Sequence, residues 1–415
     1  MKILIYSANF APEPTGIGKY SGEMAEWLVS QGHEVRVIAA PPYYPNWELA
    51  EGYKAPVYRR QTWKGVDVWR APLWVPRNPG GLKRVLHLLT FGLSSLPVAL
   101  WQVTWRPDMV LCVAPALVTA PAAFAVARLS GARAWLHIQD FEVDVAFRMG
   151  LLQGKWPRRI VSWFEQRLLR RFDAVSSISD RMVDRLLAKG VLPSKVHSFP
   201  NWVDISQVQP LQRESSYRSE LSIEPGTKVV LFSGSLGGKQ GLTVIPEAAR
   251  LLQHRQDILF IIGGEGVMKQ QLQAQSEGLK NVRFLPLQPM SKLGDWLGLA
   301  DIHVLPQSPE AEDLVLPSKL AGMLASGKPV VATCRGGTEL CRVVSTCGAV
   351  VKPEDAQALA TAIEGLADSP EDRARLGAVG RRYAEDRLGQ QGVLQRFEVE
   401  CLDLLPHHEA GVVRP

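Results

Sequence analysis

The sequence predicts an α/β protein with two doubly wound domains in tandem, and three observations support this fold class. Short apolar runs alternate with segments of helical spacing in the first half of the chain. The same alternation begins again in the second half. Alternating strands and helices are typical of βαβ units around a parallel sheet. The length of 415 residues accommodates two domains, and 46% apolar with 21% charged residues is a globular composition.

In the first half, five apolar runs are predicted strands: 2–6, 34–39, 108–113, 133–138 and 174–179. Helical spacing occurs between them, at Tyr20, Met24, Trp27 and Leu28, at 119–130 and at 157–171. Ser179 and Asp180 are candidates to cap a further helix at its N-terminus. The pattern predicts a parallel sheet with helices in its connections.

The second half repeats the pattern, with predicted strands at 228–232, 257–262, 281–285, 301–305 and 329–333. A proline-containing segment of little periodicity, 198–214, is predicted to be the hinge. We therefore expect one domain at 1–205 and another at 206–387. A helical pattern continues to about residue 405. Ligands of such folds bind where strand carboxyl ends converge, and we expect the site in a cleft between the domains.

Charge is distributed unevenly between the halves. Residues 1–205 hold 25 Lys and Arg against 16 Asp and Glu, a formal charge of +9. The rest holds 22 against 25, which is −3, and eleven of the twelve tryptophans lie in the first half. A basic, Trp-rich half suggests a polyanion or an acidic membrane surface as partner. No nucleic-acid motif occurs there, so we expect no nucleic acid to bind.

Residues 85–105 form an uncharged stretch long enough to span a bilayer. Its polar residues favour a helix that is buried or lies in the membrane interface, with Lys83 and Arg84 at one end and Trp101 and Trp105 at the other. Five arginines at 158, 159, 167, 170 and 171 add to the basic character, although a solvated helix face would explain them too. Five cysteines without a CxxC pair fit a reducing cytosol, and no cleavable signal segment is expected at the N-terminus.

Glycine-rich turns follow several predicted strands, where backbone N–H groups can hold phosphate. Gly16 and Gly18 lead into the first helix, although a turn that serves only the fold would look the same. After the strand at 228–232 comes GSLGGKQG, in which Lys239 lies among four glycines. Glycines and one ammonium suit a diphosphate, and the spacing is not that of a Walker loop. Glu265 follows the next strand and begins a helix.

A third loop ends in Pro317-Ser318-Lys319, which is predicted to open a helix. Ser318 and Lys319 then face any anion at the helix N-terminus. Glu312 and Asp313 precede this turn and would contact sugar or ribose hydroxyls, unless they are solvated loop residues.

The segment HIQDFEVDVAF contains the candidate acids of the first domain. Asp140 comes where a strand ends, so its carboxylate is a candidate base or a stabiliser of positive charge on a sugar. His137 alternates with apolar residues and is predicted to be packed within the strand. Glu142 and Asp144 are candidate caps of the next helix. No D-x-D pair occurs, which disfavours a metal-dependent mechanism.

Six motifs together resemble the GT-B glycosyltransferases of family 4: TGIGKYSGEMAEWL, GHEVRVIAAPPYYP, LHIQDFEVD, FPNWVD, SGSLGGKQGL and LPSKLAGMLASGKPVVA. Within that family the chain is most similar to bacterial colanic acid biosynthesis fucosyltransferases. The resemblance implies two Rossmann-like domains, with the nucleotide-sugar donor on the C-terminal one and the acceptor on the N-terminal one. It also implies retention of the anomeric configuration, no bound metal or cofactor, and a C-terminal helix at about 388–405 that crosses back to the first domain.

Site residues follow from the resemblance by position. Gly16, Gly18, Gly234 and Ser235 match donor-binding loops, and Lys239 matches the diphosphate-binding lysine. The remaining matches are Glu265 in the next loop, Ser318, Lys319 and Leu320 at a phosphate-binding helix start, and Asp140 at the position of the catalytic-site acid or histidine. Two departures stand out. Ser235 replaces a frequent arginine, and Leu314 and Gly322 replace a pair of glutamates. Either a variant set of residues binds the donor, or other acids such as Glu312 or Glu339 substitute for the missing pair.

The resulting hypothesis is a cytoplasmic glycosyltransferase, peripheral on the inner face of the cytoplasmic membrane and in contact with its anionic lipids. It would move fucose from GDP-fucose to a polyprenyl-linked saccharide in exopolysaccharide synthesis. A UDP-sugar donor remains an alternative. There are two further alternatives, since fold alone does not prove function. One is a sugar-nucleotide epimerase on the same fold, which needs no acceptor. The other is a non-catalytic scaffold that binds nucleotide or membrane.

Overall fold

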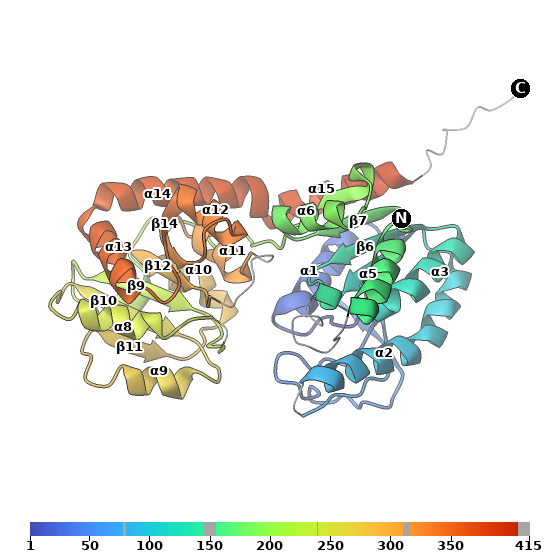
Figure 1. The fold of residues 1–415 in the computed structure, drawn as a ribbon, viewed down its shortest axis with the longest axis horizontal. Coiled ribbons are helices and arrows are strands. Elements are labelled where there is room, and N and C mark those ends of the chain that lie inside the picture. The colour runs from blue at the N-terminus through green and yellow to red at the C-terminus, as the bar shows by residue number, and fades with distance from the viewer. Residues whose placement is uncertain (78–79, 116, 145–154, 239, 310–315, 406–415) are drawn as a thin grey trace, which may run out of the picture. The chain divides into compact units, whose positions relative to one another are not determined.

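The computed structural model describes residues 1–77, 80–115, 117–144, 155–238, 240–309 and 316–405 (Figure 1). The chain forms two compact units. The N-terminal unit holds Met1–Phe199 and the chain from Leu394 on, and the C-terminal unit is Pro200–Val393. The sequence had suggested a first boundary at 205/206 and a return to the first domain from 388; the structure divides the chain at Pro200 and Leu394.

The N-terminal unit is built on an eight-stranded sheet in the order β3-β4-β2-β1-β5-β6-β7-β8. Its strands are β1 (Lys2–Ser7), β2 (Glu34–Ala39), β3 (Arg59–Trp63), β4 (Val66–Arg70), β5 (Met109–Ala114), β6 (Arg133–Ile138), β7 (Ala174–Ser177) and β8 (Val196–Ser198). All neighbouring pairs are parallel except β3 with β4. The central strand β5 is buried along its whole length, and its neighbour β6 is buried from its second residue on, as apolar runs covered on both faces should be.

Helices fill the connections of this sheet. They are α1 (Gly16–Ser30), α2 (Gly81–Trp101), α3 (Ala120–Ser130), α5 (Lys155–Leu169), α6 (Asp180–Ala188) and the later part of α15 (Gln390–Leu404). Three 3-10 turns accompany them: η1 (Gln102–Trp105), η2 (Leu117–Thr119) and η3 (Pro193–Lys195). The predicted cap of α6 is confirmed, because Ser179 Oγ accepts a hydrogen bond from Met182 N at 3.2 Å.

The C-terminal unit has a six-stranded sheet in the order β11-β10-β9-β12-β13-β14, with every pair parallel. The strands are β9 (Lys228–Ser233), β10 (Ile258–Gly263), β11 (Val282–Leu285), β12 (Ile302–Pro306), β13 (Val330–Thr333) and β14 (Gly348–Val351). The chain leaves β9 toward β10 and β11, then returns to β12 and continues outward the other way. The strand order therefore reverses between β9 and β12, which is where doubly wound folds bind ligands.

Two apolar cores lie on the two faces of this sheet. One includes residues of α7 (Ser216–Glu220), α10 (Leu293–Gly298), α11 (Ser318–Ala325) and α12 (Glu339–Cys347). The other includes α8 (Val244–Leu251), α9 (Lys269–Gln275) and α13 (Ala356–Asp368). The remaining helical segments of this unit are η4 (Met290–Lys292), α14 (Pro370–Tyr383) and a π-helical turn, η5 (Ala384–Leu388). Side chains of β9 alternate between the cores, with Val229 and Leu231 in one and Val230 and Phe232 in the other.

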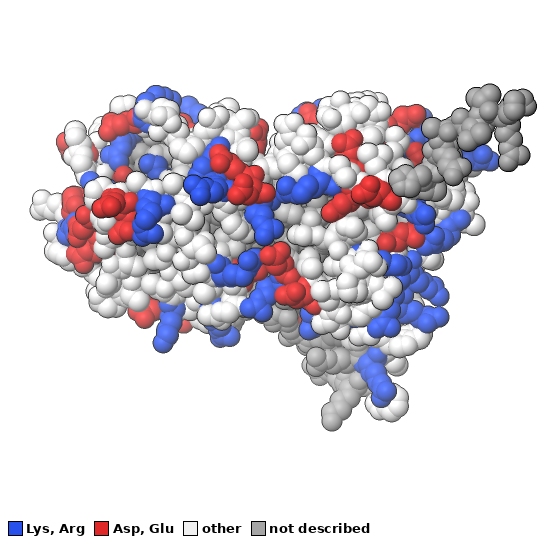
Figure 2. Space-filling model, turned by 90° about the horizontal axis from the view of Figure 1, so that it is seen from above, with Lys and Arg blue, Asp and Glu red and all other residues white. Residues whose placement is uncertain are grey.

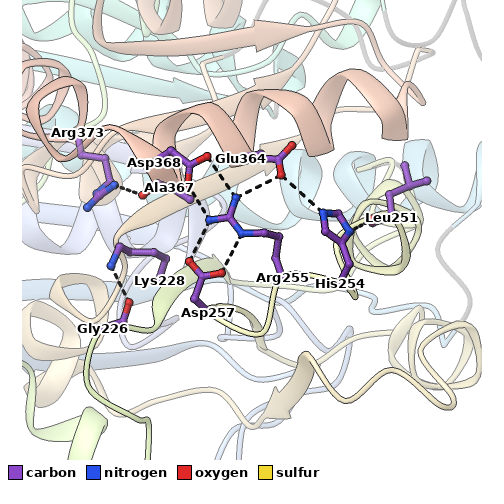
Figure 3. A network of polar contacts seen from close by, with 10 residues as sticks. All are labelled: Gly226, Lys228, Leu251, His254, Arg255, Asp257, Glu364, Ala367, Asp368 and Arg373. Carbon is purple, nitrogen blue, oxygen red and sulfur yellow. Dashed lines mark hydrogen bonds and ion pairs between the residues drawn. The ribbon is translucent and has the colours of Figure 1, made fainter.

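The amino edge of the same sheet carries a polar network centred on Arg255, in the turn before β10 (Figure 3). Its guanidinium lies 2.9 Å from Asp257, 3.2 Å from Glu364 and 2.7 Å from Asp368. The last two residues belong to α13, so the arginine ties the end of that helix to the start of β10.

The prediction of two doubly wound α/β units is confirmed, with strand ends within about two residues of those predicted. Four strands were missed: the β3–β4 hairpin, β8 and β14. The hairpin escaped notice because RRQTW in β3 is mostly exposed and lacks an apolar alternation. Its antiparallel edge also departs from the purely parallel sheet that was expected.

Candidate active site

Two glycine-containing loops lie side by side at the carboxyl ends of β9 and β10. Gly234 N donates to Gly263 O at 2.9 Å, and Leu236 N donates to Glu265 O at 2.8 Å. Gly264 has a φ of +153°, and a side chain there would overlap the carbonyl oxygen of Gly234. Glycine is thus required at 264 both for its backbone angle and for the closeness of the two loops.

Lys319, in the first turn of α11, meets these loops across the switch point between β9 and β12. Its Nζ donates to Gln240 Oε1 at 2.8 Å and to Ser235 O at 3.1 Å. The same atom lies 4.4 Å from the centroid of the Phe232 ring. A side chain at Gly234 would overlap the aliphatic part of Lys319, so position 234 must be glycine for Lys319 to lie where it does.

The charge of Lys319 has no counter-ion in the part of the chain that the structure describes. Its two hydrogen-bond acceptors, a carbonyl and an amide oxygen, are neutral. Burial lowers the pKa of the ammonium to about 8. A desolvated cation held by neutral dipoles is unfavourable unless an anion completes the site, because Coulomb attraction grows where water is displaced. The arrangement therefore suits a phosphate or diphosphate.

The other predicted residues of this unit are placed unequally. Ser318 is exposed at the start of α11, as predicted, and Ser235 is exposed with its Oγ 3.3 Å from Gln240 Nε2. Glu265 is exposed and paired with Lys269 at 2.7 Å. The side chain of Leu320 is fully buried in the core and so cannot reach a ligand. Lys239 and Glu312 lie outside the described residues.

Glu339 follows β13 at the same edge of the sheet, in the first turn of α12. Its carboxylate is buried and lies 2.6 Å from Arg342 Nη2. A ribose contact from Glu339 would have to compete with this ion pair.

In the N-terminal unit, Gly16 begins α1 and Gly18 is buried in its first turn. Gly16 lies beside the Tyr44 ring, and Gly18 lies beside Glu13, a residue that was not predicted to be functional. Glu13 Oε1 accepts hydrogen bonds from Tyr43 N (3.1 Å) and Tyr44 N (3.0 Å), and a side chain at Gly18 would overlap the carboxylate. Burial raises the pKa of Glu13, while the backbone hydrogen bonds oppose the rise. This carboxylate therefore fixes the loop after β1 against the loop after β2.

Arg70 is a second residue that the sequence did not reveal. It is fully buried at the end of β4 and donates to Ala40 O at 2.8 Å and to Ala11 O. Burial lowers its pKa to about 10. The turn motif APEP, with an acid directly before the glycines, was the available signal for Glu13; no local signal marks Arg70, whose partners are backbone carbonyls distant in sequence.

Asp140 lies two residues beyond the end of β6, as predicted. The residue is open to solvent, yet enough protein surrounds its carboxyl that desolvation raises the pKa, and the positive charge of Arg84 lowers it in part. A carboxylate of raised pKa is a better general base than one free in water. Arg84, from the first turn of α2, is the basic side chain that balances it.

Of the three neighbouring acidic or basic residues, His137 is packed within β6 as predicted. Its Nδ1 lies 2.9 Å from Ser176 Oγ, and burial lowers its pKa to about 3, so the ring is neutral. The helix that Glu142 and Asp144 were expected to cap continues into residues outside the described part of the chain, so their capping role stays a prediction. Glu142 Oε2 accepts from Leu117 N at 2.7 Å, and Asp144 pairs with Arg185 at 3.1 Å and Lys189 at 3.2 Å. Glu142 is thus bound to η2, and Asp144 is bound to the C-terminal end of α6.

All five cysteines are free. Among the described residues, no group of three or more His, Cys, Asp or Glu side chains is placed to hold a metal ion.

Two family models match the chain. A glycosyl transferase 4-like domain covers residues 15–202, and a glycosyl transferases group 1 domain covers residues 227–369. The chain is 42% identical over 407 residues to the putative colanic acid biosynthesis glycosyl transferase WcaI of Escherichia coli K12, an alignment that covers 96% of this chain and 98% of that protein.

Solved structures agree at the level of the fold. Sucrose-phosphate synthase from Thermosynechococcus elongatus aligns with a TM-score of 0.73 and 16% identity, over 97% of this chain and 98% of that one. HepE from Anabaena, in complex with UDP-glucose, aligns with a TM-score of 0.68 and 16% identity, over 97% and 100%. With both domain models, a relative along nearly its whole length and this fold, the chain belongs to the glycosyltransferases of the GT-B fold, in the group of glycosyl transferase 4-like and group 1 proteins.

Proposed function

We propose that this glycosyltransferase moves fucose from GDP-fucose to a lipid-linked oligosaccharide in the synthesis of a colanic acid-type exopolysaccharide. The name of the Escherichia coli relative supports the pathway. The choice of fucose, of guanine as the base and of a lipid-linked acceptor rests on the resemblance described above. The anomeric configuration is retained in this proposal.

The observation that carries the donor assignment is the ammonium of Lys319 beside the two glycine loops, which has no carboxylate partner among the described residues. During transfer the bond between the anomeric carbon and the diphosphate breaks, and negative charge develops on the departing diphosphate. Lys319 stabilises that charge, and it does so strongly because its own surroundings are desolvated. Lys239 is proposed to act with it.

The acceptor hydroxyl must lose a proton as its oxygen bonds to the sugar. Asp140 is proposed to act near the anomeric carbon or at this hydroxyl, as a base or as a stabiliser of positive charge on the sugar. Its raised pKa and its access to solvent are consistent with either role. Gly16 and Gly18 are proposed to admit donor phosphate, with Glu13 holding their loop in place.

The test of this role is replacement of Asp140. We expect Asp140→Ala to keep the fold and the donor affinity while transfer falls by several decades. Asp184→Ala, which removes an exposed carboxylate on α6 of the same unit, is the matched control and should transfer at the normal rate. Undiminished turnover of Asp140→Ala would remove this residue from the mechanism.

The donor itself is identified by thermal denaturation against a panel of nucleotide-sugars. A ligand at 100 times its Kd adds about 2.7 kcal/mol to the free energy of unfolding. We expect GDP-fucose to stabilise the protein most. Stronger stabilisation by a UDP-sugar would assign the donor to that class, and an altered sugar after incubation without acceptor would indicate an epimerase.

A further inference from the structure

The outer face of α5 exposes four large apolar side chains. Trp156, Ile160, Trp163 and Phe164 are 78%, 62%, 59% and 58% exposed. Their spacing of four, seven and eight residues from the first places them on one side of the helix. Isolated apolar residues on a surface are ordinary, but such a contiguous group marks an interaction site.

Arginines border this apolar group. Arg159, Arg167 and Arg171 are exposed, and the Arg167 guanidinium lies 5.7 Å from the centroid of the Trp163 ring. None of the three has a carboxylate partner among the described residues. Glu165 is the only acidic residue of α5, and it is buried against Lys189 at 2.5 Å. The outer face is therefore apolar and cationic, without an acid.

A second helix of the same unit, α2, also leaves an apolar stripe exposed. Its members recur at helical spacing and are Leu82, Leu86, Leu89, Leu93, Leu96 and Leu100. With η1, α2 is the helix of the described chain long and apolar enough to cross a membrane, and 33% of its most apolar window is buried. Its inner side belongs to the unit's core, since Ser95 Oγ lies 2.5 Å from Tyr6 Oη and Phe91 packs edge-on against Tyr6. Spanning a bilayer would break these contacts, whereas lying flat on one keeps them.

Both helices lie on the same face of the sheet. The connections β4 to β5, β5 to β6 and β6 to β7 all step in one direction along the strand order. Right-handed crossovers then place α2, α3 and α5 together on one face, as Figure 1 shows. In the space-filling view of Figure 2, Lys and Arg side chains gather on this unit at the right of the view.

We propose that the outer face of α5, together with the leucine stripe of α2, docks on the surface of an anionic phospholipid bilayer. Amphipathic helices with aromatic and aliphatic residues on one side and basic residues beside them bind at the headgroup boundary. Anionic headgroups supply the counter-charges that Arg159 and Arg167 lack. A second copy of the chain fits less well, because a symmetric contact would bring these arginines against their own equivalents.

The inner side of α5 connects this docking face to the loop that carries Asp140. Lys189 Nζ lies 2.5 Å from Glu165 of α5 and 3.2 Å from Asp144, four residues beyond Asp140. The docked helix and the site loop are thus held by one ion-pair cluster. This deepens the proposed function, since it brings the acceptor-side acid to a surface where lipid-linked acceptors lie, but the docking itself does not depend on sugar transfer.

The test is flotation of the full-length protein with vesicles, in the absence of donor and acceptor. Vesicles of phosphatidylcholine alone are compared with vesicles containing 30 mol% phosphatidylglycerol, at low and at high salt. We expect binding to the anionic vesicles at low salt, and at least tenfold weaker partitioning to the neutral ones or at high salt. Absence of binding to anionic vesicles at low salt overturns the proposal.

Variants locate the surface. Trp163→Ser with Phe164→Ser, Arg159→Glu with Arg167→Glu, and Leu93→Glu on α2 should each weaken partitioning about tenfold or more. The control Leu192→Ser with Arg382→Glu changes an exposed leucine and an exposed arginine elsewhere, and it should bind as the wild type does. All substituted residues are exposed, and circular dichroism checks that each variant is folded. Unchanged binding of the α5 variants refutes the assignment to this face.

Sedimentation of the wild type tests the other occupant. A dimer that the Trp163→Ser, Phe164→Ser variant dissociates would show that this face binds a second copy, which also overturns the proposal. A transfer assay with a water-soluble acceptor separates failure of the docking proposal from failure of the proposed glycosyltransferase function. The α5 variants should keep it, and Asp140→Ala should lose it even when bound to vesicles.

Discussion

Two edges of one sheet in the C-terminal unit treat positive charge in opposite ways. At the amino edge, Arg255 lies among Asp257, Glu364 and Asp368, which raise its pKa above the usual value (Figure 3). At the carboxyl edge, the described residues offer Lys319 two neutral oxygens and an aromatic ring, and burial lowers its pKa to about 8. Within the described part of the chain, carboxylates therefore pair with Arg255 but not with Lys319.

The difference suggests that Arg255 has a structural role and that Lys319 has a role in ligand binding. The ion pairs of Arg255 connect the end of α13 to the start of β10, and nothing is left for a further anion to satisfy. Since the described residues give Lys319 no carboxylate, we expect it to gain a counter-charge when an anion binds between the glycine loops. Substitutions at the two edges should therefore affect stability and transfer in opposite proportions.

The largest effect is expected for Lys319→Met. Losing one charge that stabilises the departing diphosphate should reduce transfer about a hundredfold to a thousandfold, with stability unchanged or increased. Arg255→Gln is the matched control; it should cost about 1 kcal/mol of unfolding free energy and leave transfer intact, because its network is partly exposed. Steady-state kinetics and urea denaturation of both variants measure these quantities. Equal losses of activity in the two variants would erase the distinction between the edges.

The next largest effect is expected from alanine substitution of two glycines, one at the carboxyl edge of the sheet and one in a turn away from it. Gly264→Ala, at the carboxyl edge, forces a side chain against the Gly234 carbonyl and should cost about 3 kcal/mol of unfolding free energy and weaken donor binding. Gly278, in the turn before β11, also has a positive φ, +80°, but open space around it, so Gly278→Ala serves as the control. It should cost about 1 kcal/mol and leave donor affinity unchanged. Denaturant titration and calorimetric binding test this, and a Gly264→Ala variant as stable as Gly278→Ala would contradict the packing of the two loops.

A smaller effect is expected from pH. The pKa of Lys319 is about 8 in the folded protein against an ordinary 10.5, so the unfolded chain binds more protons between these values. Stability of the donor-free protein should therefore rise with pH across that window. Donor affinity should change the opposite way, constant below pH 8 and about tenfold weaker at pH 9, since binding requires the charged ammonium. Calorimetry from pH 7 to 9.5 measures both trends, and Lys319→Met should abolish them. A wild-type affinity that is flat to pH 9.5 would remove Lys319 from the donor site.

Much of the fold could be read from local patterns. Buried parallel strands are continuous apolar runs, so β2 and β6 were located without error, and Ser179 marked the start of α6 through its own hydrogen bond. The β3–β4 hairpin could not be found this way. Its pairing is set by contacts with β2, and its own side chains are largely exposed.

The site shows the same division. The glycines after β9 and the Pro-Ser-Lys turn before α11 are local signals, and the structure brings both to the β9–β12 switch point. The neutral partners that Lys319 has among the described residues depend on packing between segments about 80 residues apart. The burial of Leu320 likewise depends on the packing of α11 in the core. Glu13 and Arg70 escaped for the same reason, because their partners are backbone groups of other loops.

The last helix has a consequence for how the chain is made. Phe397 of α15 is buried in the N-terminal unit, where its ring stacks on Phe199 at a centroid distance of 4.5 Å and lies edge-on to Trp135 at 5.0 Å. The N-terminal unit is thus discontinuous in sequence, with the entire C-terminal unit inserted before its final helix. During synthesis on the ribosome, residues 200–393 emerge complete while Trp135 and Phe199 still lack their cover. The domain that is begun first is therefore finished last, and its aromatic surface stays open to chaperones until the final segment has been translated.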